Sequence, residues 1–268
     1  MIRHKKQPAT FVIITQARSG SYHLKSLLDS ADDIVCHGEI FKRKRVELSD
    51  WHRKKLGMSP KDTLMRDADR PRYLTQLRGL NPKQIFGFKL FYAHKNPDDG
   101  LNNYLFSDNS WKKIFLYRNP LETYASLLRA RKTGKWVHKA GGGGMRSAVD
   151  RVEESLIRFD ATEFNKHFEK CRRNILSSIQ IAEKQKNDCF WLNYKDLNDS
   201  SKWADLLAFL GSSSSADSLK SEYNKQYHST IDSAFSNWGD VLNHLETNQL
   251  SYLLNDDCNL IKNMTRQQ

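Results

Sequence analysis

The sequence has few cysteines and no long apolar run. No cysteine forms a CxxC pair or stands at metal-ligand spacing from a histidine, so neither a disulfide framework nor a zinc site is indicated. We expect free, buried thiols at Cys36, Cys171, Cys189 and Cys258. No stretch approaches the roughly 18 apolar residues of a membrane-spanning helix, and the basic N-terminus MIRHKKQPAT lacks the apolar core of a signal peptide. These absences predict a soluble, cytoplasmic protein without a membrane span.

Acidic residues are scarce in only one half of the chain. Residues 1–139 contain 28 Lys and Arg against 13 Asp and Glu, a balance of +15, whereas residues 140–268 contain 15 against 18, a balance of −3. A basic N-terminal half indicates an anionic partner, such as a nucleotide, a polyanionic glycan, a nucleic acid or an acidic membrane. The 13 Phe, 10 Tyr and 6 Trp supply the bulky side chains of a folded core, so the composition predicts a folded, enzyme-sized protein.

Short runs of β-branched and aromatic residues alternate with helical patterns. The runs predict buried strands at residues 10–15 (TFVIIT), 85–91 (IFGFKLF), 113–117 (KIFLY) and 189–193 (CFWLN), and apolar periodicity predicts helices around 24–31 and 159–186. This alternation predicts a P-loop-like α/β fold with three layers, α/β/α, around a mainly parallel sheet of four to five strands. We expect a single domain over residues 1–268.

Two runs of small residues interrupt this pattern. Four consecutive glycines at 141–144 form a backbone that is costly to fix, so residues around 137–147 are predicted to form a mobile loop. This loop is either a plain connection or a lid that closes over substrate. The serine run at 212–215 is predicted to be a second flexible point, in a turn between two helices.

The stretch TFVIITQARSGSYHL, residues 10–24, passes from a predicted strand through a tight turn into a helix. Such a turn gathers backbone N–H groups and the positive end of the helix dipole around one point, which suits a phosphate-like group. Ser19, Gly20 and Ser21 permit a close approach, and Arg18 adds a charge-assisted donor. A plain strand-to-helix connection is the alternative interpretation of this turn.

A second cationic position ends the strand KIFLY. Asn119 is a predicted N-cap, Pro120 takes the first helical position, and Glu122 follows three residues after the cap. Arg118 therefore stands at the carboxyl end of the strand. Open parallel sheets bind ligands at this edge, so we expect Arg18 and Arg118 to face one crevice.

The nucleotide-binding motif GxxxxGK[ST] is missing. Its Lys and Ser/Thr would bind the phosphates and magnesium, and no later predicted strand ends in an Asp that would hold the metal, because KIFLY is followed by Arg118. The pattern therefore predicts sites for anions without a metal ion.

Three segments together resemble a known family: the strand and RSGS turn at residues 11–21, HGEIF at 37–41, and FLYRNPLETYASLLRA at 115–130. They are similar to sulfotransferases that use 3′-phosphoadenosine 5′-phosphosulfate (PAPS), in particular bacterial carbohydrate sulfotransferases of the trehalose and nodulation-factor type. In that family a strand-ending Arg and a Ser eight positions later bind the 3′-phosphate, which implies this role for Arg118 and Ser126. The first turn holds the 5′-phosphosulfate, which implies donor contacts from Arg18, Ser19, Gly20, Ser21, Tyr22 and His23. Tyr22 and His23 depart from the family's usual residues, so backbone contacts are expected there.

The resemblance also implies the catalytic groups. In the family a Glu that follows a small residue after the second strand is the general base, and Glu39 stands at this position, with an ion-paired or helix-capping carboxylate as the alternative. His37 and His94 are alternative bases. Lys89, a charge within an apolar strand, should point into the crevice or pair with a carboxylate. Lys89 and Arg18 would stabilise the charge that develops during transfer.

Two later segments carry weaker resemblances. Tyr194 in WLNYKDL is similar to a family Tyr that lies near the adenosine, and Trp238 in SNWGDVL is similar to a C-terminal Trp that covers the nucleotide. Core packing is the alternative for both side chains.

These features favour a metal-independent sulfotransferase that moves a sulfuryl group from PAPS, in line, to a hydroxyl of a carbohydrate or glycoconjugate, and releases 3′-phosphoadenosine 5′-phosphate (PAP). The acceptor can itself be anionic, and residues 42–84 and 132–160, where its pocket would be built, match nothing in the family. A nucleotide kinase is the enzymatic alternative, opposed by the missing Lys and Asp. A nucleic-acid-binding protein is the non-enzymatic one, motivated by KRKR at 42–45, but no nucleic-acid-binding motif accompanies this run.

Overall fold

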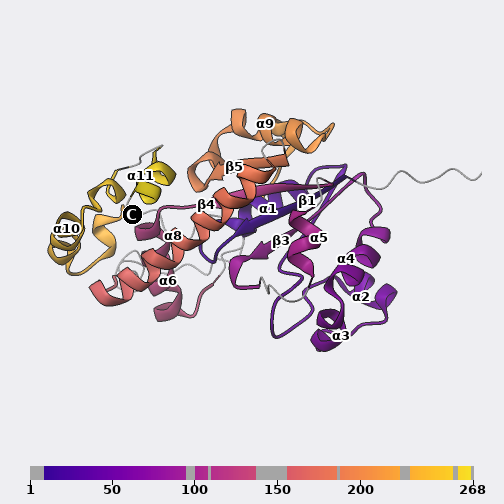
Figure 1. Ribbon diagram of the computed structural model, residues 1–268, viewed down its shortest axis with the longest axis horizontal. Helices are drawn as coiled ribbons and strands as arrows, with labels where there is room; N and C mark the ends of the chain where they lie inside the picture. The colour runs from indigo at the N-terminus through magenta and orange to yellow at the C-terminus, as the bar shows by residue number, and fades with distance from the viewer. Residues whose placement is uncertain are drawn as a thin grey trace, which may run out of the picture. The chain divides into compact units, whose positions relative to one another are not determined.

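Five strands pair in one sheet (Figure 1). Its order is β2-β3-β1-β4-β5, with the bounds β1 Ala9–Thr15, β2 Ile34–His37, β3 Ile85–Phe91, β4 Trp111–Tyr117 and β5 Cys189–Asn193. The pairs β1–β3, β1–β4 and β2–β3 are parallel. The predicted α/β fold with a mainly parallel sheet is therefore confirmed. The short strand β2 was not among the four strands predicted from composition.

The structure, a computed structural model, describes residues 9–94, 100–107, 110–136, 156–185, 188–223, 230–255 and 259–266. The predicted mobile loop around 137–147 lies outside these ranges. The chain divides into two compact units. Unit 1 comprises Met1–Gln16, Gly20–Leu116 and Ile181–Glu222, and unit 2 comprises Ala17–Ser19, Tyr117–Gln180 and Tyr223–Gln268. A single domain over residues 1–268 stays a prediction.

Helices make up most of the remaining secondary structure. Unit 1 contains α1 Ser21–Asp29, α2 Asp50–Leu56, α3 Thr63–Ala68, α4 Arg70–Gly79, α5 Leu101–Phe106 and α9 Ser200–Leu210. Unit 2 contains α6 Pro120–Thr133, α10 Trp238–Thr247 and α11 Leu260–Arg266, while α8 Ala161–Lys184 has residues in both units. Short 3₁₀ helices are η1 Tyr92–His94, η3 Tyr194–Asn198, η4 Ala216–Ser218, η5 Asp232–Ala234 and η6 Ser251–Leu253. Among the described residues, no helix combines the length and apolarity needed to cross a membrane.

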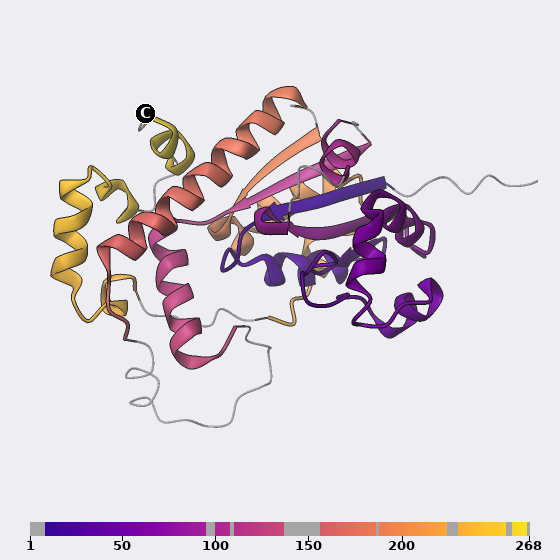
Figure 2. The same ribbon diagram turned by 60° about the horizontal axis from the view of Figure 1, so that its bottom comes forward.

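Helices cover both faces of the sheet because successive side chains of β1 point to opposite sides. Phe11 and Ile13 pack in one apolar cluster with α1 and α9, whereas Val12 and Ile14 pack in another with α4 and α5. These layers, which confirm the α/β/α prediction, can be followed in Figures 1 and 2. Gly87 pairs with Phe11 across β3 and β1, and a Cβ atom at residue 87 would lie 2.0 Å from the Phe11 ring. The glycine in the strand IFGFKLF therefore makes room for a core phenylalanine.

Unit 2 has an apolar cluster of its own. Helices α6, α8, α10 and α11 contribute buried side chains to it, among them Leu121, Tyr124, Phe164, Val241 and Met264. Asn119 caps α6 as predicted, because its side chain accepts a hydrogen bond from the Leu121 N–H at 2.9 Å. Its amide also donates to the Leu253 carbonyl at 2.8 Å, so the cap ties the start of α6 to η6.

The cysteines within the described ranges carry free thiols. Cys36 and Cys171 are buried, as predicted, and Cys189 is half-buried. Cys258 lies outside the described residues.

The serine run after α9 is anchored to a buried carboxylate. Asp33 accepts hydrogen bonds from Ser212 Oγ at 2.7 Å, from the Ser213 N–H at 2.8 Å and from Ser214 Oγ at 3.0 Å. The prediction of a turn between helices is correct, because the run connects α9 to η4, but the prediction of flexibility is wrong for these serines. Burial opposes ionisation of Asp33, but the serine hydrogen bonds outweigh it, so the pKa of this carboxyl is lowered.

We predict that Asp33→Asn lowers the free energy of unfolding by about 1–3 kcal/mol at pH 7, because hydrogen bonds to a charged acceptor are stronger than those to a neutral one. A carboxyl with a lowered folded-state pKa stabilises the fold above its unfolded pKa of about 3.9, and this contribution is lost as the pH falls through the folded pKa. Urea unfolding at pH 7 and at about pH 2 measures the difference. The exposed neighbour Asp32 gives the control, Asp32→Asn, and equal destabilisation by the two changes would contradict the assignment.

Candidate active site

The turn between β1 and α1 has an unusual backbone. Arg18 has a φ of 71° and Gly20 a φ of 85°, both in the left-handed region. Left-handed backbone at a residue other than glycine is strained, and such strain persists where the surroundings hold the chain. Gly20 is the N-cap of α1, no side chain caps this helix end, and no acidic residue stands in its first turn. The start of α1 therefore carries no negative side chain that would repel an anion, which an anion site at a helix N-terminus requires.

A Cβ atom at Gly20 would meet the aromatic ring of Tyr194. It would lie 2.5 Å from Tyr194 Cδ2, far closer than van der Waals contact allows. The ring of Tyr194 therefore covers the turn from the start of η3. Glycine is required at position 20 for two reasons: its backbone is left-handed, and the ring of Tyr194 approaches too closely for a side chain.

Unit 2 brings three of the predicted donor-binding residues together. Arg18 Nε donates to Ser126 Oγ at 3.0 Å, and Arg118 Nη1 donates to the Arg18 carbonyl at 3.1 Å. Arg18 Nη1 also donates to the carbonyl of Trp136. Hydrogen bonds thus link Arg18, Arg118 and Ser126, which lies on the second turn of α6, whereas a crevice that both arginines face stays a prediction.

Arg118 is also ion-paired. Its Nε lies 2.8 Å from Glu122 Oε2, one helical turn later, and both side chains are mostly buried, at 15% and 24% exposure. The sequence predicted Glu122 as a helix-start residue that supports the Asn119 cap. Its carboxylate instead holds the guanidinium of Arg118 at the end of the strand.

Unit 1 brings Glu39 and Lys89 together. Lys89 Nζ lies 3.1 Å from Glu39 Oε1, with the lysine side chain fully buried and the glutamate side chain 9% exposed. The pairing follows from the sheet, because β2 and β3 are parallel neighbours and the Lys89 N–H donates to the carbonyl of Gly38 at 3.2 Å. Lys89 was expected to point into a crevice or to pair with a carboxylate, and it takes the second of these arrangements.

Tyr22 contacts both members of this pair. Its hydroxyl donates to Glu39 Oε1 at 3.3 Å, and Lys89 Nζ lies 3.4 Å from the centroid of its ring. The ring of Phe91 lies 4.9 Å from the same ammonium group. Burial lowers the pKa of Lys89, while Glu39 acts in the opposite direction. The ammonium is thus held by one carboxylate and two aromatic faces.

The two histidines considered as alternative bases lie in different surroundings. His37 packs against His52 and Phe86, with ring centroids 4.7 Å and 5.5 Å away, and burial lowers the pKa of His37 to about 3. A group with this pKa is neutral at pH 7 but a weak base. The ring of His94 stacks on Phe91 at 5.4 Å, and burial lowers its pKa as well.

The remaining predicted donor-binding residues are mostly enclosed. Ser19 and Ser21 are buried, and His23 Nδ1 lies 2.7 Å from Ser221 Oγ. Trp238 packs in the cluster of unit 2, where its ring stacks on Phe235 at 6.3 Å. The donor-binding roles of these residues, like those of Arg18, Gly20, Tyr22, Tyr194, Arg118 and Ser126, stay predictions.

No sequence signal predicted the contact between Tyr22 and Glu39. The two residues are 17 positions apart, and no motif links them. Tyr22 was predicted to contact the donor, and only the folded chain reveals its bond to the carboxylate. Within the part of the chain that the structure describes, no three His, Cys, Asp or Glu side chains are arranged to hold a metal ion.

A comparison with curated proteins bears on the class of protein to which the chain is similar. Over 251 residues the chain is 25% identical to nodulation protein H of Rhizobium tropici, and the match covers 91% of this chain and 92% of that protein. No protein-family model matches the chain. The resemblance to bacterial sulfotransferases of the nodulation type is therefore confirmed.

Solved structures show remote similarity. A sulfotransferase from Alicyclobacillus acidocaldarius has a TM-score of 0.49 at 14% identity, covering 95% of this chain and 98% of that one. The sulfotransferase domain of the Synechococcus PCC 7002 olefin synthase has a TM-score of 0.45 at 18% identity, covering 92% and 96%. A mouse sulfotransferase complexed with PAP has a TM-score of 0.43 at 13% identity, covering 97% and 89%. With TM-scores this low, the fold assignment stands on the sheet itself.

We predict that Gly20→Ala destabilises the protein by about 1–3 kcal/mol, because the new Cβ atom would strain the left-handed backbone and clash with Tyr194. Thermal unfolding measures the loss. Gly79→Ala is the matched control, since a Cβ atom at this helical glycine would meet nothing within 4 Å. An unchanged melting temperature in Gly20→Ala would show that the turn can move away from Tyr194.

Proposed function

We propose that the protein is a sulfotransferase that moves a sulfuryl group from PAPS to a hydroxyl of a carbohydrate or glycoconjugate. The observation that carries the proposal is the convergence of Arg18, Ser126 and Arg118 in unit 2, joined by hydrogen bonds of 3.0 Å and 3.1 Å. Two guanidinium groups and a hydroxyl are donors that suit phosphate oxygens. The match to nodulation protein H supports the same class of reaction.

The residues present fit a donor that carries anionic groups. Gly20 begins α1 with a left-handed backbone and no side chain, no acidic residue stands in the first turn, and the positive end of the helix dipole favours an anion there. We assign the 5′-phosphosulfate to Arg18, Ser19, Gly20 and Ser21. The 3′-phosphate is assigned to Arg118 and Ser126, with Glu122 holding the Arg118 guanidinium in place from one side. Tyr194 and Trp238 are the candidates for contact with the adenosine.

Glu39 is the proposed general base. The acceptor hydroxyl must lose its proton as its oxygen bonds to sulfur, and a positioned carboxylate can take that proton. Both Tyr22 and Lys89 contact Oε1 of Glu39, so we assign the proton transfer to Oε2. The lowered pKa of His37, at about 3, argues against a base at that position.

Lys89 and Arg18 are the proposed electrostatic groups. PAPS supplies the sulfuryl group and, as the S–O bond breaks, negative charge passes to the departing phosphate. A fixed cation in a buried site stabilises such charge far more than it would in water. Lys89 is fully buried beside the base, and Arg18 stands in the turn assigned to the phosphosulfate.

Donor binding can be measured by calorimetry with PAP in metal-free buffer. We predict that Arg118→Ala weakens PAP binding about 10- to 100-fold, which corresponds to the loss of one or two charge-assisted hydrogen bonds. Arg131→Ala is the matched control, because this arginine lies near the end of α6, the helix that follows Arg118, and its side chain is 54% exposed. Absence of PAP binding by the unmodified protein, or equal effects of the two changes, would reject the donor site.

The rate of sulfuryl transfer tests the proposed role of Glu39 as general base. We predict that Glu39→Gln reduces turnover of PAPS with a sugar acceptor about 10²- to 10⁴-fold while PAP affinity is retained, because the change removes the proton acceptor and the charge beside Lys89 but leaves the residues assigned to PAP unaltered. Glu47→Gln removes a carboxylate paired with Lys42 at 3.3 Å and serves as the control. Undiminished turnover in Glu39→Gln would transfer the role of base to His37 or His94.

A further inference from the structure

A buried arginine holds the segment that follows Glu39. Arg66, on α3, is fully buried, and its Nη1 donates to three backbone carbonyls: Ile40 at 3.1 Å, Lys42 at 2.8 Å and Arg45 at 3.2 Å. These acceptors belong to one short segment. The guanidinium thus fixes the course of the backbone immediately after Glu39.

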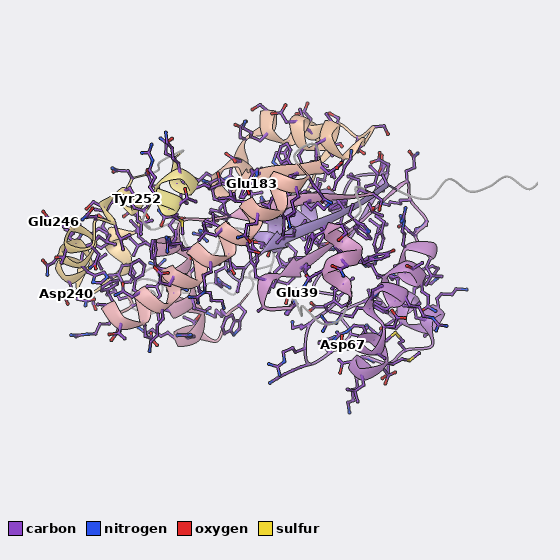
Figure 3. All side chains as sticks on the ribbon, in the orientation of Figure 1. Glu39, Asp67, Glu183, Asp240, Glu246 and Tyr252 are labelled. Carbon is purple, nitrogen blue, oxygen red and sulfur yellow. The ribbon has the colours of Figure 1, made fainter. Side chains whose placement is uncertain are left out.

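The same arginine is locked by its neighbour Asp67. Arg66 Nε and Nη2 donate to the two carboxylate oxygens of Asp67 at 2.8 Å and 2.7 Å. Arg70 Nε donates to Asp67 Oδ1 at 3.0 Å, and its Nη1 donates to the carbonyl of His94 at 2.9 Å. Burial opposes ionisation of Asp67, but the two arginines outweigh it and lower its pKa. Figure 3 labels Asp67 at α3 and Glu39 on the segment after β2.

The Arg66–Asp67–Arg70 cluster therefore reaches the segments that follow two neighbouring strands. Arg66 holds the residues after β2, where Glu39 stands, and Arg70 holds η1 after β3, the strand that carries Lys89. Lysine could not replace Arg66, because five N–H groups in a planar fork serve carbonyls on one side and a carboxylate on the other. We propose that Arg66, Asp67 and Arg70 are positioning residues that hold Glu39 and Lys89 in register for proton abstraction. This inference rests on the proposed function.

A positioning role and a merely structural role affect different measured quantities, kcat in the first case and the melting temperature in the second. A general base acts only within about 2.6–3.2 Å of the proton donor, and misplacement by about 1 Å can reduce turnover about 10²-fold. Loss of the cluster should therefore lower kcat in a protein that is still folded. A cluster that only stabilises unit 1 would lower the melting temperature and leave kcat unchanged below it.

The principal variant is Asp67→Asn. Asp67 is 31% exposed, so the change weakens the shared partner of both arginines without opening a core cavity. With radiolabelled PAPS and a pool of oligosaccharides, we expect kcat to fall about 10- to 100-fold, while the acceptor KM and PAP affinity stay within about twofold of the unmodified protein. Arg66→Lys should show a loss at least as large. Arg70→Lys, which keeps the charge, should recover more activity than Arg70→Ala.

Hydrogen exchange gives a readout that needs no activity. The Lys42 N–H donates to the Glu39 carbonyl at 3.0 Å, so its exchange reports on the backbone beside the base. We expect faster exchange there in Asp67→Asn than in the unmodified protein. Arg53→Gln is the matched control, since Arg53 also bonds a backbone carbonyl, that of Leu48, and a nearby carboxylate, Asp50.

The outcomes separate the two proposals. Unchanged kcat in folded Asp67→Asn and Arg66→Lys would overturn the positioning role, as would equal losses in Arg53→Gln. Absence of transfer by the unmodified protein would reject the proposed function instead. In that case the exchange of Lys42 still decides whether the cluster anchors the segment, and unchanged exchange would overturn that as well.

Discussion

The buried charge of Lys89 is a constraint on which several parts of unit 1 depend. An ammonium group without water needs a nearby negative charge, because an unpaired buried charge costs several kcal/mol. Glu39 supplies that charge at 3.1 Å, and the ring of Tyr22 supplies an aromatic face at 3.4 Å. The parallel pairing of β2 with β3 and the turn that starts α1 are thereby tied to one point. Removing either charge leaves the other buried without an opposite charge beside it, so the contributions of Lys89 and Glu39 cannot be separated.

The fold was largely predictable because its signals are local. Strands β1, β3, β4 and β5 are short apolar runs between polar turns, and the start of α6 is signalled by three nearby residues, Asn119, Pro120 and Glu122. The strand β2 was not predicted, because its sequence IVCH has only four residues and no alternation of apolar and polar residues that would indicate a strand. The prediction of flexibility for the serine run after α9 was wrong for a different reason. Small polar residues are typical of flexible turns, and only the folded chain brings Asp33 to them.

The candidate site was predictable where it follows the ends of strands. Arg18, Arg118 and Glu39 each come shortly after a strand, so parallel strand order alone places them at carboxyl edges. Contacts between distant residues were not predictable in this way. The bond from Tyr22 to Glu39 depends on how α1 packs beside β2, and the pairing of Arg118 with Glu122 competes with the capping role that the same spacing permits. Side-chain direction, which the sequence pattern does not contain, decides both.

The contacts of Arg66 have a consequence for how such a protein can diversify. All three of its bonds to the segment after Glu39 go to main-chain oxygens, which every amino acid possesses. The side chains of Arg43 and Lys44 in the same segment are exposed. Evolution or a designer could therefore exchange these side chains, and with them the charge offered to an incoming molecule, while the backbone beside the carboxylate keeps its course. The arrangement separates what the segment recognises from where it is held.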